Sequence, residues 1–168
     1  MKKLILLFVL CLVSQFGFSQ NLVKVDFSGF DDKQELKQEL KQELKIVDKK
    51  EFKDLATKAD VGVAYLEPNK IKSYNVKNGI KLIRVTSKNI QELKKSFEFS
   101  NSVELIVIDI VKPNFNLNSI KCFNLKQFNN LKYIYFRYQI DLKNNSTLQK
   151  FDCLPATVKQ YYTQQTAS

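Results

Sequence analysis

Histidine and tryptophan are both absent from this chain of 168 residues. Without histidine, serine–histidine and cysteine–histidine nucleophile systems are excluded, and the commonest nitrogen ligand for metals is missing. Without tryptophan, a sugar-processing cleft lacks a favoured stacking side chain. A hydrolase that works with two carboxylates stays compatible with the sequence, because it needs only Asp and Glu.

Glycine is scarce as well, with four in the whole chain. Gly29, Gly62 and Gly79 are too far apart in the sequence to form a phosphate-binding loop. The only consecutive acidic pair, Asp31-Asp32, fits a helix start better than a metal site, and no Asp-x-Asp calcium loop is present. We therefore expect no catalytic motif, no metal site and no cofactor.

The first residues have the pattern of a secretory signal peptide. Lys2 and Lys3 give a positive start, residues 4–13 are an unbroken apolar run, and Gly17-Phe18-Ser19 has small residues at its first and third positions. We predict a signal peptide over residues 1–19, cleaved between Ser19 and Gln20, and a secreted or periplasmic protein. A membrane-spanning helix needs about 20 apolar residues, and the run over residues 4–13 is about half that length. We therefore interpret the run as part of a cleaved leader and expect no membrane span after cleavage.

Cleavage would change both the charge and the cysteine count. The net charge would fall from +10 to +8 with the loss of Lys2 and Lys3. A basic chain is compatible with anionic partners, but lysines spread over exposed faces for solubility are the simpler interpretation, and we expect no nucleic acid partner. Cys122 and Cys153 would remain, either as a disulfide in an oxidising compartment or as two buried thiols.

Three perfect copies of Lys-Gln-Glu-Leu occupy residues 33–44. All four residue types are strong helix formers, so we predict a helix over about 32–46. Leucine recurs every four residues and not every 3.5, which argues against a coiled coil. The capping pattern Asp48-x-x-Glu51 predicts a second, short helix that ends near Lys58. Residues 20–59 are thus expected to form an N-terminal helical cap region.

From residue 60 to residue 168, short apolar runs of β type alternate with segments of helical spacing. Three runs share one form, apolar-x-x-apolar-x-apolar, and they begin at Ile80, Val103 and Leu131, 23 and 28 residues apart. A weaker run begins at Val158, and a degenerate one at Val61. A strand followed by a helix at this period indicates a repeat architecture.

The run Ile80-x-x-Ile83-x-Val85 continues to Ile90 and Leu93, and Leu125-x-x-Phe128-x-x-Leu131 leads into the third run. Over roughly residues 61–165 the chain resembles the leucine-rich-repeat family in these segments. The resemblance implies an α/β fold. It would be a short solenoid with parallel strands near 80–85, 103–110 and 131–138, and a fourth from the weaker run near 158–163, preceded by an N-terminal helical segment. An ordinary two-layer α/β domain would give similar spacing.

If these strands line an open face, side chains at alternate positions of each run point outward. The candidate binding residues are Arg84, Asp109, Tyr133, Tyr135, Arg137 and Tyr162. Tyr and Arg often dominate binding energies, so we expect this face to bind a protein or a glycan. The alternative is that another element covers Tyr133 and Tyr135, which the neighbouring apolar residues of the second run favour.

These patterns favour a secreted, non-enzymatic binding module. Two hypotheses from other classes stay open. One is a small hydrolase using a carboxylate pair such as Asp109 and Asp141. The other is a structural envelope protein that assembles through the Lys-Gln-Glu-Leu helix.

Overall fold

The computed structural model describes residues 22–25, 41–112, 115–117, 120, 122–140 and 148–164. Its strands are β1 (Val23–Lys24), β2 (Gly62–Glu67), β3 (Lys70–Tyr74), β4 (Ile80–Thr86), β5 (Leu105–Ile110), β6 (Tyr133–Tyr138) and β7 (Lys159–Gln164). One α-helix, α2 (Lys41–Thr57), is accompanied by the 3-10 helices η1 (Val76–Asn78), η2 (Ile90–Lys94), η3 (Ser100–Ser102) and η5 (Cys122–Gln127). The predicted signal peptide, the first two Lys-Gln-Glu-Leu copies and Asp141 lie outside the described residues.

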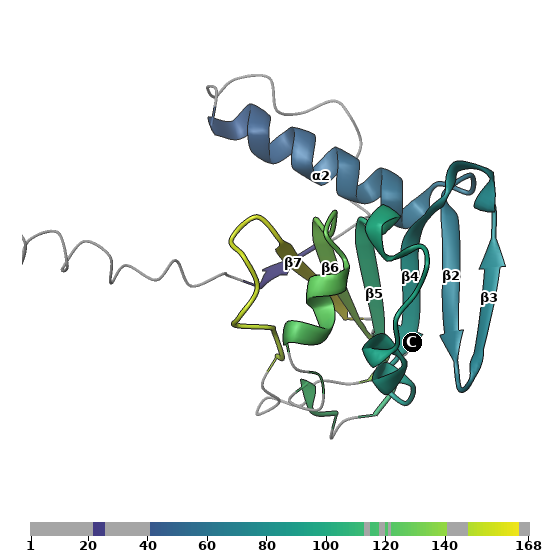
Figure 1. Ribbon diagram of the computed structural model, residues 1–168. Helices are drawn as coiled ribbons and strands as arrows, with labels where there is room; N and C mark the ends of the chain where they lie inside the picture. Colours follow the sequence, from purple (N-terminus) through teal and green to yellow (C-terminus); the bar gives the residue numbers. More distant parts are fainter. Residues whose placement is uncertain are drawn as a thin grey trace, which may run out of the picture.

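The strands form one mostly parallel sheet in the order β1-β7-β6-β5-β4-β2-β3. From β2 through β4, β5 and β6 to β7, each strand pairs in parallel with the next long strand (Figure 1). Only β3 is antiparallel, to β2. The predicted α/β class and the parallel strands near all four expected positions are therefore confirmed.

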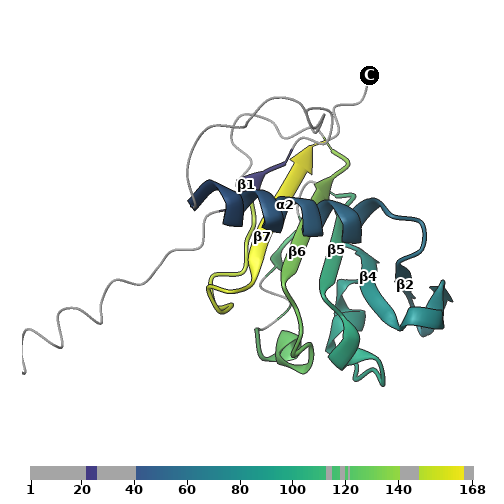
Figure 2. The same ribbon diagram turned by 90° about the horizontal axis from the view of Figure 1, so that it is seen from above.

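The two faces of this sheet are buried against different elements. All six residues of β5 are buried, as expected for a parallel strand covered on both sides. Ile106, Ile108 and Ile110 belong to the core on the side of the 3-10 helices. Leu105 and Val107 belong to a second core, which Phe52 of α2 shares. The second core exists because α2 lies across the sheet, in front of β7, β6 and β5 (Figure 2).

Helix α2 differs from the two helices predicted for this region. The sequence predicts a helix ending near residue 46 and a new one starting at Asp48, but the helix continues from Lys41 through Asp48 to Thr57. The capping pattern at Asp48 therefore starts no helix, since no Pro or Gly interrupts the run of helix formers there. The other predicted helices are short 3-10 turns after β4 and before β6, and no helix lies among residues 148–158.

Glutamine side chains hold the connections to the sheet. The Gln160 side chain accepts a hydrogen bond from the Phe151 amide (2.8 Å) and donates one to the Phe151 carbonyl (2.7 Å). Gln127 donates from Nε2 to the carbonyls of Leu93 (3.1 Å) and Lys95 (3.0 Å). Such bonds satisfy backbone groups that the irregular connections would otherwise bury unpaired.

The fourth strand is shifted by one residue relative to the predicted run. Tyr135 lies beside Tyr161 in the observed register, whereas the run predicted from Val158 would place Tyr162 there. A one-residue shift moves every side chain to the other face of the strand. Tyr162 therefore packs against the core beneath the 3-10 helices, edge-on to Tyr138, and its prediction as a residue of the open face is wrong.

Two glycines permit the close approach of β2 and β4 where both begin. A Cβ atom at Gly62 would collide with the carbonyl oxygen of Gly79. Gly79 itself has φ of 77°, a region that residues with side chains rarely adopt. These strand starts lie beside the C-terminal end of α2, at the edge of the region considered next.

Candidate binding site on the open half of the sheet

Helix α2 covers the starts of the central strands through one aromatic side chain. The Phe52 ring is 1% exposed. Its centroid lies 5.6, 5.3 and 4.5 Å from those of Tyr133, Tyr135 and Tyr161. Tyr133 and Tyr135 are thus 2% and 5% exposed, and the prediction that they line an open face is wrong. An apolar strip on a sheet gains free energy when it is covered, and the amphipathic α2 supplies the cover.

A network of ion pairs surrounds this aromatic contact. It contains Lys81–Glu104 (2.7 Å), Lys132–Glu104 (2.8 Å), Lys132–Glu51 (2.6 Å) and Lys159–Asp48. Burial alone would raise the pKa of Glu104, but hydrogen bonds from Lys132 and Lys81 outweigh burial and place that pKa below its ordinary value. Burial, together with a hydrogen bond to Glu51, raises the pKa of Tyr133 far above its ordinary value. The network therefore joins α2 to the sheet.

Beyond α2, the same face of the sheet carries Arg84, Asp109 and Arg137 on three adjacent strands. Asp109 is 6% exposed. Arg84 Nε donates to its Oδ2 at 3.0 Å, and Arg137 Nε donates to its Oδ1 at 2.5 Å. Burial raises the pKa of Asp109, while the hydrogen bond and charge of Arg84 act in the opposite direction. The structure thus brings together three of the six predicted binding residues.

These are the only two arginines in the chain, since lysine supplies the other 25 of its 27 basic residues. Each guanidinium group contacts Asp109 through Nε. Among the described residues, the terminal nitrogens of both groups have no hydrogen-bond partner. Arg84 also lies over the Tyr65 ring, with its Cζ 5.8 Å from the ring centroid. One buried carboxylate therefore orients two guanidinium groups whose remaining donors are available.

Two hollows meet at this triad. The first, about 240 Å³, lies between the C-terminal end of α2 and the sheet, and no acidic residue lines it. The second, about 350 Å³, lies over the ends of the strands. Tyr65, Arg84 and Arg137 line both hollows, and we call the combined depression the arginine groove. Its floor is polar at the triad and apolar toward α2, where Leu82 and Val107 lie.

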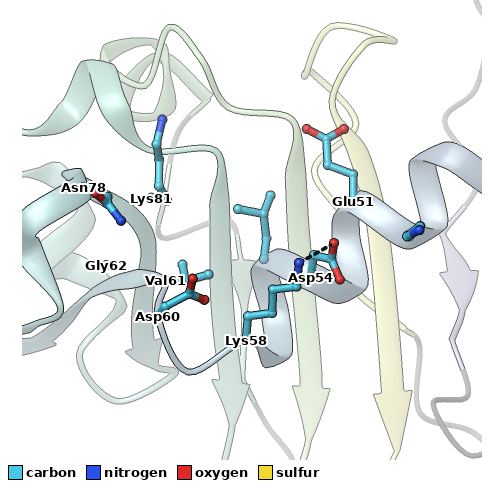
Figure 3. Close-up of a pocket in the computed structure, with 10 residues that line it drawn as sticks. Glu51, Asp54, Lys58, Asp60, Val61, Gly62, Asn78 and Lys81 are labelled. Carbon is cyan, nitrogen blue, oxygen red and sulfur yellow. Dashed lines mark ion pairs between the residues drawn. The ribbon is translucent and has the colours of Figure 1, made fainter.

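Another hollow, about 460 Å³, lies on the far side of the α2 C-terminal end, near the starts of β2 and β4 (Figure 3). Its charged groups largely pair with one another or with the ion-pair network. Lys58 Nζ lies 2.9 Å from Asp54 Oδ2, Glu51 bonds Lys132, and Lys81 bonds Glu104. This hollow therefore offers an anionic or cationic ligand fewer available partners than the arginine groove does.

Tyr65 is a groove residue beside Arg84 that the sequence analysis did not single out. It lies beside Arg84 in the register, at the fifth position of the degenerate run that begins at Val61. Extending the outward-facing pattern to that run would have identified it. The scarcity of arginine was a second signal, because both arginines fall at outward positions of predicted runs.

The described part of the chain gives limited information on the other predictions. Cys153 is disulfide-bonded, but the side chain of Cys122 lies outside that part, so their pairing stays a prediction. No group of three Asp, Glu or Cys side chains among the described residues is placed to hold a metal ion. No described helix is long and apolar enough to cross a membrane. No protein-family model, curated protein or solved structure matches the chain.

Proposed function

We propose that this protein is a non-enzymatic binding module that holds an anionic group of a protein or glycan partner in the arginine groove. One observation carries the proposal: both arginines of the chain bond the same buried carboxylate through Nε, and both line the groove. A guanidinium group binds carboxylate, sulfate or phosphate oxygens in pairs, with directional hydrogen bonds.

The triad favours binding because it positions the donors in advance. A free arginine loses side-chain entropy when it binds a ligand, and this cost falls if the side chain is already held in place. Tyr65 adds a ring beside Arg84, against which a sugar or a planar group can pack. The apolar part of the floor near Leu82 and Val107 would exclude water from one side of the ligand.

The contacts of Asp109 favour binding over hydrolysis. Both of its carboxylate oxygens accept hydrogen bonds from arginine. Glu67, the other acidic residue along the groove, pairs with Lys72 at 2.5 Å. A two-carboxylate hydrolase needs one carboxyl group as acid and one as base or nucleophile, and these partners compete with both roles.

We also propose that the protein is exported and that its sheet is a short solenoid of leucine-rich-repeat type. The pattern of residues 1–19 and the disulfide at Cys153 support export, since disulfides persist in oxidising compartments. Sequential parallel strands, with 3-10 helices on one side, support the solenoid.

Two probes test the groove: a short oligogalacturonide, which is a carboxylated glycan, and a short peptide ending in two glutamates. Fluorescence anisotropy should detect binding of one of them to the wild-type protein. The double variant R84K/R137K keeps the charge but loses the paired donors, so binding should weaken by about tenfold or more.

The matched control is K94Q/K126Q, which removes two exposed charges from η2 and η5 on the other side of the sheet. It should bind almost as the wild type does. Equal losses in the two variants would mean that net charge alone attracts the probe. If R84K/R137K loses structure by circular dichroism, phenylglyoxal labelling of the wild type replaces it: a bound probe should protect both arginines, and labelling unaffected by the probe would overturn the proposal.

A further inference from the structure

The hairpin of β2 and β3, together with η1, concentrates exposed apolar surface. In the described part of the chain, four large apolar side chains are exposed, and three of them lie within six residues: Ile71 (44%), Tyr74 (55%) and Val76 (53%). Single exposed apolar side chains are ordinary, but several along one edge segment favour an interaction surface.

Strand β3 is also an edge of the sheet. It pairs with β2 on one side, and none of the described strands lies on its other side (Figure 1). An unpaired edge presents backbone donors and acceptors to any extended chain that approaches it. Peptide recognition by strand addition uses such an edge.

The register with β2 assigns a different chemistry to each face of β3. Lys72 lies beside Tyr65 and Lys70 beside Glu67, so both lysines are on the face of the arginine groove. Ile71 lies beside Leu66, which belongs to the core on the opposite face. Tyr74 lies beside Val63, on the lysine face, and Lys72 pairs with Glu67 at 2.5 Å. An added strand would therefore meet the charge of Lys70, the Lys72–Glu67 pair and the Tyr74 ring on one face, and Ile71 on the other.

We propose that β3 binds an extended segment of a partner polypeptide in which acidic and apolar residues alternate. The acidic side chains would lie beside Lys70 and Lys72, and an apolar side chain would lie beside Ile71, because neighbouring residues across a strand pair share a face. A second copy of β3 is a poorer occupant, since its own lysines would face these lysines. Lys70 and Ile71 line neither hollow of the arginine groove, so their role here does not depend on the function proposed for the groove. Tyr74 does line the groove, and the variants that test this site leave Tyr74 unchanged.

The probe is a labelled synthetic peptide of alternating glutamate and valine, and its binding is followed by fluorescence anisotropy. A lysine–valine peptide of equal length should bind at least roughly tenfold more weakly. A glutamate–valine peptide N-methylated at every residue keeps the charge but has no backbone N–H to donate from either edge, so it should not bind. Equal binding of the methylated peptide would overturn strand addition.

Variants of the protein locate the site. K70E/I71S, which changes no residue of the groove, should weaken binding of the peptide by roughly tenfold. K94E, the same charge change on η2, and R84K/R137K should leave binding of the peptide unchanged. Loss of binding in R84K/R137K with none in K70E/I71S would place the peptide in the groove and refute the β3 site. Light scattering of the protein alone should give a monomer; a dimer that K70E/I71S separates would show that a second copy occupies the edge.

Discussion

At the scale of single residues, Gln160 shows how a polar side chain is accommodated in this core. It is 2% exposed, and its amide bonds both the N–H and the C=O of Phe151. A buried amide is stable only when its hydrogen bonds are made. Gln160 thus fixes the connection before β7 against the sheet.

Replacing Gln160 with leucine should destabilise the protein by about 1–3 kcal/mol, because two backbone groups of Phe151 lose their partner. The measurement is urea unfolding followed by circular dichroism or tyrosine fluorescence, since the chain has no tryptophan. Gln164→Leu, a less buried position on the same face of β7, is the control and should change stability less. An equal effect at both positions would contradict this role for Gln160.

The contribution of Glu104 to the free energy of unfolding should depend on pH. Its pKa in the folded protein lies below the ordinary value, because hydrogen bonds from Lys132 and Lys81 outweigh its burial. Such a carboxylate stabilises the fold above its unfolded-state pKa, and this stabilisation is lost as the pH falls through the folded-state pKa.

Glu104→Gln should therefore cost about 1 kcal/mol at neutral pH. The difference from wild type should shrink as the pH falls through the folded-state pKa of Glu104, because the protonated carboxyl group is then uncharged like the amide. Urea unfolding at neutral pH and at a series of acidic pH values measures this difference. Glu98→Gln, at an exposed position, should show no such change. A difference that persisted in acid would mean that the ion pairs are not its source.

At the scale of elements, α2 is held to the sheet mainly by Phe52. The ion pairs around it join partly exposed groups, and such pairs contribute little individually. Phe52→Ala should destabilise the protein by about 3–5 kcal/mol. Hydrogen exchange of the α2 amides should accelerate more than that of β5.

The control for α2 is Lys49→Ala, at an exposed position of the same helix. It should leave both the urea midpoint and the exchange rates near those of wild type. If Phe52→Ala behaves like Lys49→Ala, α2 does not depend on its aromatic contact, and the burial of the three tyrosines beneath it would need another cause.

The elements also show what the sequence could and could not predict. The strands around Ile83, Ile106 and Ile134 were predictable, because a strand buried on both faces leaves a dense run of β-branched residues. The register of β7 against β6 was not predictable, since Tyr161 and Tyr162 are adjacent aromatic residues and either could face α2. Nor could the sequence show that α2 lies over Tyr133 and Tyr135, because local patterns do not specify which face a remote helix covers.

At the scale of the whole molecule, the face of the sheet that carries α2 is divided into a covered part and an open part, while the opposite face packs against the other core. Helix α2 and the ion-pair network cover the starts of the central strands, and the arginine groove lies beyond them. The predicted residues divided accordingly: Arg84, Asp109 and Arg137 lie in the groove, Tyr133 and Tyr135 are buried, and Tyr162 faces the opposite core.

The central claim is that Asp109 positions both arginines to bind an anionic group. Because the chain has only two arginines, a ¹⁵N NMR spectrum should contain just two arginine Nε–H signals. Both should exchange slowly with water, since each donates to Asp109. On titration with the oligogalacturonide or the glutamate-ended peptide, both signals should shift together and saturate at one affinity. Binding of a probe that leaves both signals unmoved would contradict the account.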